Sequence, residues 1–249
     1  MNKDYLYKIF HIDQEIKDRR SELYEQAYIY MSNNFIELDT QTIKISCDEE
    51  YKEFLNKTPG FNVFGDGAVG TIDHEGWKYG EIGIWASNYT AWNNFLKTDA
   101  KYLILMEDDI VIHPDFKENL ENFISQLPED FDAFSMFSPE SHWELYNSHP
   151  HNYDIGKENI SKAYQDWSML CFIISRKGAE KAIQSVKEGI FYPIDWNFFK
   201  RTEKFEVYTV KPVYRFCWLE QLESTFQAKE YRIKLEGNIQ LDMNNFYTR

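Results

Sequence analysis

The apolar and polar positions along the 249 residues alternate between the period of strands and the period of helices. Tyr7–Ile12 predicts a first strand, and the spacing of Ile16, Leu23, Ala27 and Tyr30 predicts a helix after it. A short strand is expected at 42–46. Further helices are expected over 79–96, 115–127 and 176–187, and further strands over 102–106, 132–137, 167–174 and 205–210. This alternation predicts an α/β protein with a mostly parallel central sheet flanked by helices.

Two segments have no clear period. The first contains five glycines between positions 60 and 76, but it has neither the GxGxxG spacing nor the GK[ST] ending of a phosphate-binding loop, so a plain loop is expected. The second, 138–165, is polar, aromatic and rich in histidine. A long irregular segment inside a compact domain is often an active-site lid, and we expect one here.

The most distinctive chemistry is the acidic triplet Glu107-Asp108-Asp109 at the end of the apolar run Tyr102–Met106. In open α/β sheets, ligands bind beyond the carboxyl ends of such buried strands. Carboxylate oxygens suit Mg²⁺ or Mn²⁺, which complete their shells with water and substrate phosphates. Glu107 and Asp109 are therefore the predicted metal ligands. The alternative is a solvated acidic turn, although apolar residues on both sides of the triplet argue against it.

A third metal ligand is open. The chain has no histidine after His151, so only His149 and His151 are late enough to serve, and only if their loop folds back. Two histidines exposed on a loop are the simpler interpretation.

Length and composition predict one domain over residues 1–249 with an ample core, because 43% of the residues are hydrophobic and 17% are aromatic. No stretch reaches the roughly 18 to 20 apolar residues needed to span a bilayer, and Met1–Tyr5 does not resemble the start of a signal peptide. We therefore expect a cytoplasmic protein, bacterial or encoded by a phage. The three cysteines are far apart, which indicates neither a disulfide framework nor a zinc cluster.

The net charge of −14 is unevenly distributed along the chain. Residues 1–150 carry 12 basic and 28 acidic side chains, whereas residues 151–249 carry 15 and 13, so the two parts have net charges of −16 and +2. Non-specific binding of nucleic acid or of an anionic membrane through the first part is therefore disfavoured.

Four segments resemble, in order, blocks of the family 25 glycosyltransferases, which include lipooligosaccharide and collagen galactosyltransferases. They are Gly80–Trp92, Tyr102–Asp109, Ile173–Lys181 and Pro193–Trp196. The resemblance extends over roughly residues 5–225. It implies a GT-A (Rossmann-like) fold, a nucleotide-sugar donor that is commonly UDP-galactose, a divalent metal, and inversion at the anomeric carbon. Residues 1–112 would bind the nucleotide sugar and 113–249 the acceptor.

The chain departs from the family pattern at two places near the expected nucleotide pocket. The first strand ends in His11-Ile-Asp13 where the family has an Asn-Leu pair, and Asn88 stands where a histidine commonly follows the serine. These departures leave the identity of the donor open.

The resemblance also implies roles for individual residues. Glu107 and Asp109 take the outer positions of a DxD-type metal motif, and Asp108 is expected to bind hydroxyls of the ribose or the sugar. Asp195, or alternatively Asp166, is the expected base that deprotonates the acceptor, although Asp195 could simply cap a helix. The remaining donor-binding candidates are Glu81, Ser87, Arg19 and Arg20.

The sequence thus predicts a metal-dependent hexosyl- or pentosyltransferase that uses Mn²⁺ or Mg²⁺ and a UDP-sugar, with a surface glycan as acceptor. A phage-type enzyme that glycosylates hydroxymethylated pyrimidines in DNA is one alternative. A non-catalytic nucleotide-sugar-binding module is another, and a phosphohydrolase using the same triplet is a third. The donor sugar, the linkage and the oligomeric state are left open.

Overall fold

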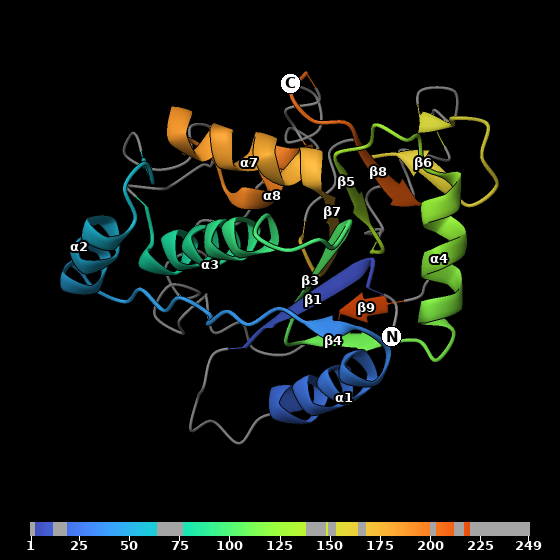
Figure 1. Ribbon diagram of the computed structural model, residues 1–249, viewed down its shortest axis with the longest axis horizontal. Coiled ribbons are helices and arrows are strands. Elements are labelled where there is room, and N and C mark those ends of the chain that lie inside the picture. Colours follow the sequence, from blue (N-terminus) through green and yellow to red (C-terminus); the bar gives the residue numbers. More distant parts are fainter. Residues whose placement is uncertain are drawn as a thin grey trace.

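The computed structural model describes residues 3–11, 19–63, 77–137, 148, 153–163, 168–199, 203–211 and 217–219. Figure 1 shows helices on either side of a central sheet. The sheet has seven strands in the order β2-β1-β3-β7-β5-β8-β6. Their bounds are β1 Tyr5–Phe10, β2 Ile36–Glu37, β3 Tyr102–Glu107, β5 Ala133–Ser135, β6 Ile160–Lys162, β7 Cys171–Ser175 and β8 Val207–Val210.

The prediction of a mostly parallel sheet is wrong. β1 pairs in parallel with β2 and β3, and β5 with β8, but β3–β7, β5–β7 and β6–β8 are antiparallel. The reason lies in what an apolar run reports. In β7, Phe172 and Ile174 pack into the core on one face and Cys171 and Ile173 into the core on the other, so the run is continuously apolar in either direction. The apolar run of β7 therefore predicts that the strand is buried, but it does not predict the direction in which the strand runs.

Each face of the sheet is covered by its own helices (Figure 1). The helices α3 (Tyr79–Phe95), α7 (Arg176–Glu188) and α8 (Ile194–Phe199) bury apolar residues in the core of one face. The helices α1 (Arg19–Asn34) and α4 (Phe116–Gln126) do so on the opposite face. The strand β4 (Ile110–Ile112) follows β3 in the sequence and pairs with β9 (Cys217–Leu219) in a small antiparallel sheet.

Most predicted elements are present, but some elements differ or were not predicted. Residues 42–46 form no strand, and β7 begins only at Cys171. The helix α2 (Asp48–Lys57) was not predicted: none of its residues is fully buried, and its apolar stripe is short, with Tyr51, Phe54 and Leu55 partly buried against the core. The glycine-rich stretch 64–76 and most of the expected lid lie outside the described residues, and the described part of the lid contains β6.

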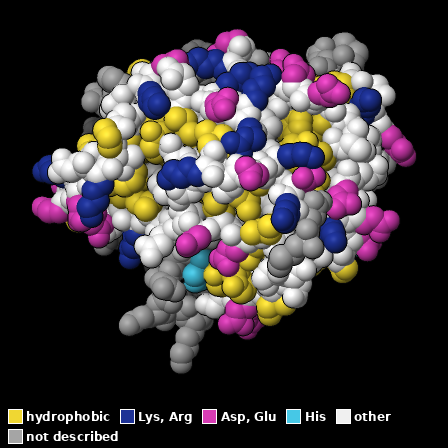
Figure 2. Space-filling model, in the orientation of Figure 1, with side chains coloured by type: hydrophobic (Ala, Val, Ile, Leu, Met, Phe, Trp, Pro, Cys, Tyr) yellow, Lys and Arg dark blue, Asp and Glu magenta, His cyan; other side chains and the backbone are white. Residues whose placement is uncertain are grey.

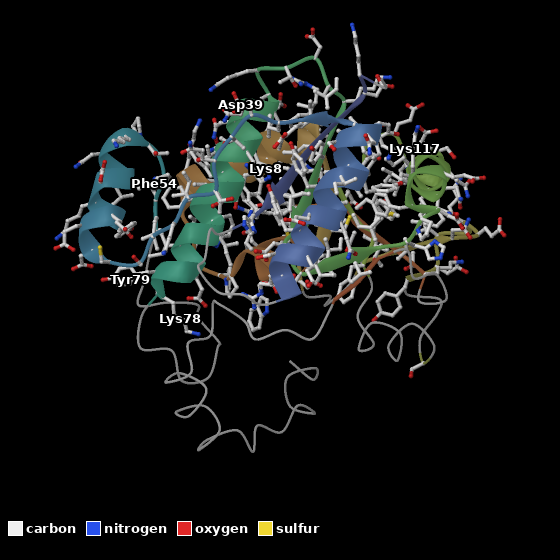
Figure 3. All side chains as sticks on the ribbon, turned by 90° about the horizontal axis from the view of Figure 1, so that it is seen from below. Lys8, Asp39, Phe54, Lys78, Tyr79 and Lys117 are labelled. Carbon is white, nitrogen blue, oxygen red and sulfur yellow. The ribbon has the colours of Figure 1, made fainter. Side chains whose placement is uncertain are left out.

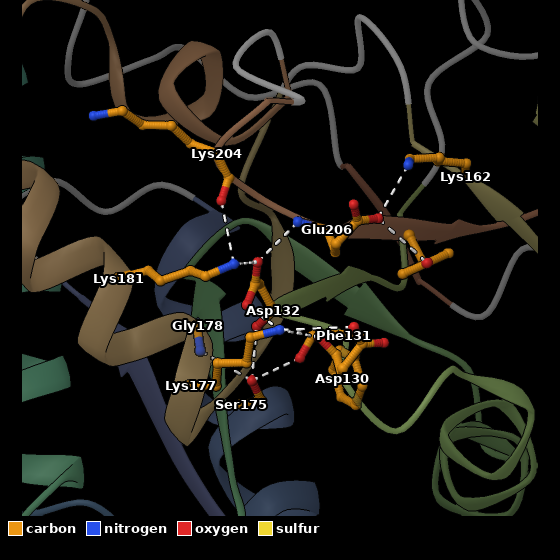
Figure 4. Close-up of polar contacts among 11 residues, drawn as sticks. Asp130, Phe131, Asp132, Lys162, Ser175, Lys177, Gly178, Lys181, Lys204 and Glu206 are labelled. Atoms are coloured by element: carbon orange, nitrogen blue, oxygen red, sulfur yellow. Dashed lines mark hydrogen bonds and ion pairs between the residues drawn. The ribbon is translucent and has the colours of Figure 1, made fainter.

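The corner between β7 and α7 is held by a buried carboxylate (Figure 4). The Asp132 side chain is 0% exposed and accepts hydrogen bonds from Lys181 Nζ at 2.6 Å and from the Glu206 N–H at 2.8 Å. Its backbone oxygen accepts from the Ser175 N–H at 3.0 Å. A Cβ added to Gly178 would lie 2.0 Å from that oxygen, so only glycine lets the helix approach this closely.

Charged side chains of both signs are interspersed on the face shown in Figure 2. Several lysines of the described residues form ion pairs, such as Lys162 with Glu206 and Lys204 with Glu188. In the part of the chain that is described, no helix combines the length and the apolar character needed to cross a membrane.

Candidate functional site

The acidic triplet lies where three strands meet. Glu107 is the last residue of β3 and pairs with Phe10, the last residue of β1, while its N–H donates to the Leu170 oxygen at 3.1 Å just before β7. Asp108 and Asp109 form the turn that leads into β4. The carboxyl ends of β1 and β3 therefore lie together at this edge of the sheet, where the apolar run of β3 predicts a ligand site.

A cavity of about 550 Å³ opens beside the triplet. One wall is the segment 42–46 and the opposite wall is a stripe along α3. The α3 residues that line the cavity are Tyr79, Gly80, Gly83, Ile84, Ser87 and Asn88. Glu107, Asp108, Asp109 and Arg20 complete the polar part of the lining. Five of the residues predicted from the sequence are thereby brought to one cavity.

Burial and, after it, the neighbouring charges shift the pKa values of the triplet. Burial, together with the charges of Asp109, Asp195 and Asp108, raises the pKa of Glu107 to about 8. Burial also raises the pKa of Asp109, which the charge of Asp108 reinforces. The pKa of Asp108 is raised by burial as well, but Arg20 and His11 oppose that shift. A cation placed among these groups would relieve the repulsion.

The carboxylates also have oxygen atoms to offer. Asp109 Oδ1 is buried and has no hydrogen-bond partner among the residues that the structure describes. Within the same residues, no three His, Cys, Asp or Glu side chains are grouped closely enough to enclose a metal ion. This donor set fits a hard cation that takes one or two carboxylates from the protein and its other ligands from water and substrate.

His11 contacts Asp108. In the sequence, His11 stood out only as part of a segment that departs from the family pattern. Its Nδ1 lies 3.3 Å from Asp108 Oδ2, and its ring stacks on Tyr24 with the centroids 4.0 Å apart. The backbone N–H of His11 donates to Thr42 Oγ1 at 3.3 Å. The only signal in the sequence was the position of His11 directly after a strand that pairs with the acidic strand.

Two donor-binding candidates lie on α3, whose start is marked by Lys78 and Tyr79 in Figure 3, and both have structural partners. The Ile43 N–H donates to Ser87 Oγ at 2.8 Å, and the Ser87 hydroxyl lies 3.3 Å from the Ile43 carbonyl oxygen, to which it donates. Ser87 thus binds one wall of the cavity to the other. Glu81 accepts from the Lys78 N–H at 3.0 Å and caps the start of α3, and it is not among the residues that line the cavity.

Asp195 is the second residue of α8 and lies close enough to Glu107 to raise its pKa. Its Oδ1 accepts from the Trp196 N–H at 2.9 Å and its Oδ2 from the Ser168 N–H at 3.2 Å. Ser168 has a φ of 78°, which is uncommon for a residue other than glycine. The carboxylate is thus held from two directions, although it does not line the cavity itself.

Asp166, His149 and His151 lie outside the described residues, as does the side chain of Arg19. Arg20 is buried at the cavity, where its charge acts on Asp108 and Asp109.

Residues 77–197 match the model of glycosyltransferase family 25, described as an LPS biosynthesis protein. The resemblance to family 25 is confirmed over these residues. The matched segment runs from α3 through the acidic triplet and α7 to Asp195, and it supports a glycosyltransferase.

No curated protein matches the chain. A solved structure titled "Crystal Structure of A197 from STIV" shares 17% identity over 51% of this chain and 63% of its own, with a TM-score of 0.29. The chain therefore spans less than two thirds of that structure, and so low a score carries no argument.

Proposed function

We propose that the protein is a metal-dependent glycosyltransferase of the GT-A fold that transfers a hexose or pentose from a UDP-sugar to an acceptor hydroxyl with inversion. The observation that carries this proposal is the acidic triplet at the wall of the cavity, where Glu107 has a pKa of about 8 and Asp109 Oδ1 has no described partner. Such a site suits a hard cation and the diphosphate that would accompany it.

Glu107 and Asp109 would hold Mn²⁺ or Mg²⁺. When bound, the cation supplies electrostatic stabilisation of the negative charge that develops on the departing diphosphate. Asp108 is oriented by His11, and the charge of Arg20 favours its ionised form, which suits it to accept hydrogen bonds from hydroxyls of the donor.

Asp195 is the proposed base. Inversion requires that the acceptor hydroxyl be deprotonated on the face of the sugar opposite the leaving group. The backbone N–H groups of Ser168 and Trp196 donate to the Asp195 carboxylate and hold it near the triplet. No direct bond from Asp195 to the triplet is needed for this. Removing the carboxylate as Asp195→Asn should lower kcat with little change in donor binding.

The acceptor is proposed to be a glycan of a surface polysaccharide. The description of the matched family as an LPS biosynthesis protein supports this choice. The excess of 41 acidic over 27 basic residues disfavours DNA as the acceptor. An acceptor panel that contains both oligosaccharides and hydroxymethylated DNA separates the two possibilities.

Release of UDP from UDP-sugars tests the proposal. The wild type should turn over with Mn²⁺ and stop when the metal is chelated, and Asp109→Asn should lose about 100-fold or more, as when one main charge-stabilising group is removed. Asp115→Asn is the matched control, since Asp115 is exposed on the chain beyond β4. A wild type that binds UDP-sugars without turnover would indicate a binding module, and full activity of Asp109→Asn would overturn the metal assignment.

A further inference from the structure

Asn88 lines the cavity in a position that none of the roles above uses. It lies in the middle of α3, is 3% exposed, and shares the cavity wall with Gly83, Ser87 and Glu107. Its Nδ2 donates to the Ile84 carbonyl oxygen at 3.0 Å, one helical turn earlier. Its Oδ1 is buried and has no hydrogen-bond partner among the described residues.

The bond to Ile84 settles which end of the amide is unpaired. If the side chain were flipped, Oδ1 would face the Ile84 carbonyl oxygen, and two acceptors would oppose each other. The oxygen is therefore the atom left over. A buried acceptor without a partner costs about 1 to 3 kcal/mol, and proteins leave few such groups unsatisfied. A leucine at this position of α3 would avoid that cost.

The chemistry of the missing partner follows from the atom that needs it. An amide oxygen accepts hydrogen bonds, so it requires an N–H or O–H group. The diphosphate of a nucleotide sugar is ionised at neutral pH and offers no such group. The hydroxyls of the transferred sugar, the hydroxyls of the ribose and the N–H of the base all do.

We propose that Asn88 Oδ1 accepts a hydrogen bond from a hydroxyl or N–H group of the nucleotide-sugar donor, so that Asn88 is a specificity-determining residue of the cavity. The inference rests on the proposed function, because it takes a nucleotide sugar as the ligand.

The test is calorimetric titration of wild type and Asn88→Ala with UDP, UDP-glucose and UDP-galactose in the presence of Mn²⁺. Loss of the hydrogen bond should weaken binding about tenfold. Asn93→Ala is the matched control: Asn93 is on the same helix, donates to the Tyr89 oxygen at 2.8 Å in the same way, and does not line the cavity. Its affinities should equal those of the wild type.

The three ligands locate the partner. If Asn88→Ala weakens binding of a UDP-sugar but not of UDP, the partner is a hydroxyl of the transferred sugar. If it weakens binding of all three equally, the partner belongs to the ribose or the base. If all three affinities stay within twofold of the wild type, the inference is overturned while the proposed function stands. If the wild type binds none of the three, the proposed function falls and the inference falls with it.

Asn88→Leu provides a second test, in a variant that is expected to be as stable as the wild type. It removes the unpaired oxygen and keeps the volume, so the free protein should unfold at or above the temperature of the wild type. The additional rise in unfolding temperature caused by UDP-sugar should shrink, because the ligand loses a partner. A variant that is stable and keeps the full ligand-induced rise would contradict the inference.

Discussion

Ser87→Ala is the most informative perturbation of the cavity wall. Ser87 is 2% exposed, and its hydroxyl accepts from the Ile43 N–H at 2.8 Å and donates to the Ile43 oxygen. The substitution removes one oxygen atom and leaves both backbone groups of Ile43 without that partner. It therefore separates the segment 42–46 from α3 at the point where the two walls of the cavity are joined.

The size of the effect follows from these contacts. A buried N–H that loses its partner costs about 1 to 3 kcal/mol, and loss of the weaker return bond adds about 0.5 kcal/mol. Alanine recovers about 0.5 kcal/mol through its higher helix propensity. The free energy of unfolding should therefore fall by about 1 to 3 kcal/mol, which for a chain of this length lowers Tm by about 2 to 12 °C.

Thermal unfolding of the metal-free and ligand-free protein measures this change directly. Ser125→Ala is the control, because Ser125 is exposed on α4 and its hydroxyl donates to the Asn122 oxygen in its own helix. It should change the free energy of unfolding by less than about 0.5 kcal/mol. If Ser87→Ala kept its Tm and only donor binding weakened, Ser87 would be a ligand contact and the reasoning about the wall would be refuted.

Three further predictions concern the rest of the molecule. Gly178→Ala should destabilise by about 2 kcal/mol or more, as read from denaturant unfolding, because its Cβ would lie 2.0 Å from the Asp132 oxygen; a neutral result would contradict that packing. Lys181→Met should lower the free energy of unfolding more than Lys177→Met, since their Nζ atoms lie 2.6 and 3.7 Å from the buried Asp132 carboxylate; equal losses would count against this ranking. The Glu107 carboxyl binds its proton more tightly in the folded than in the unfolded chain, so its contribution to stability is present below pH 4.5 and lost as the pH rises to about 8. Without metal, the free energy of unfolding of Glu107→Gln, measured in urea, should therefore rise relative to that of the wild type by a few kcal/mol as the pH rises between these values. A difference that falls with rising pH would refute the raised pKa of Glu107.

What the sequence could predict was determined by burial. The apolar runs of β3 and β7 and the helical spacing of α3 and α7 are consequences of packing against a core, and each was found at nearly the right residues. Strand direction was not predictable, because β7 is buried on both faces whichever way it runs. The helix α2 carries only a weak signal, because its three core-facing residues are partly buried.

The site was predictable only in part, for a related reason. The triplet Glu107-Asp108-Asp109 could be found from the sequence, because charged residues between apolar runs cost folding free energy unless they are paired or bind a ligand. The contact between Ser87 and Ile43 joins residues 44 positions apart, and the contact between His11 and Asp108 joins residues 97 apart. No local pattern encodes such pairs. The unpaired oxygen of Asn88 emerges only once its partners are known.

The central claim is that Glu107 and Asp109 hold the cation that accompanies a nucleotide-sugar donor. The most direct measurement is the titration of Mn²⁺ into the protein with a UDP-sugar present, following free Mn²⁺ by electron paramagnetic resonance. One Mn²⁺ ion should bind per wild-type chain, more tightly with the UDP-sugar than without it, and Asp109→Asn should abolish this binding while Asp115→Asn retains it. Equal binding of Mn²⁺ by Asp109→Asn and the wild type would contradict the claim.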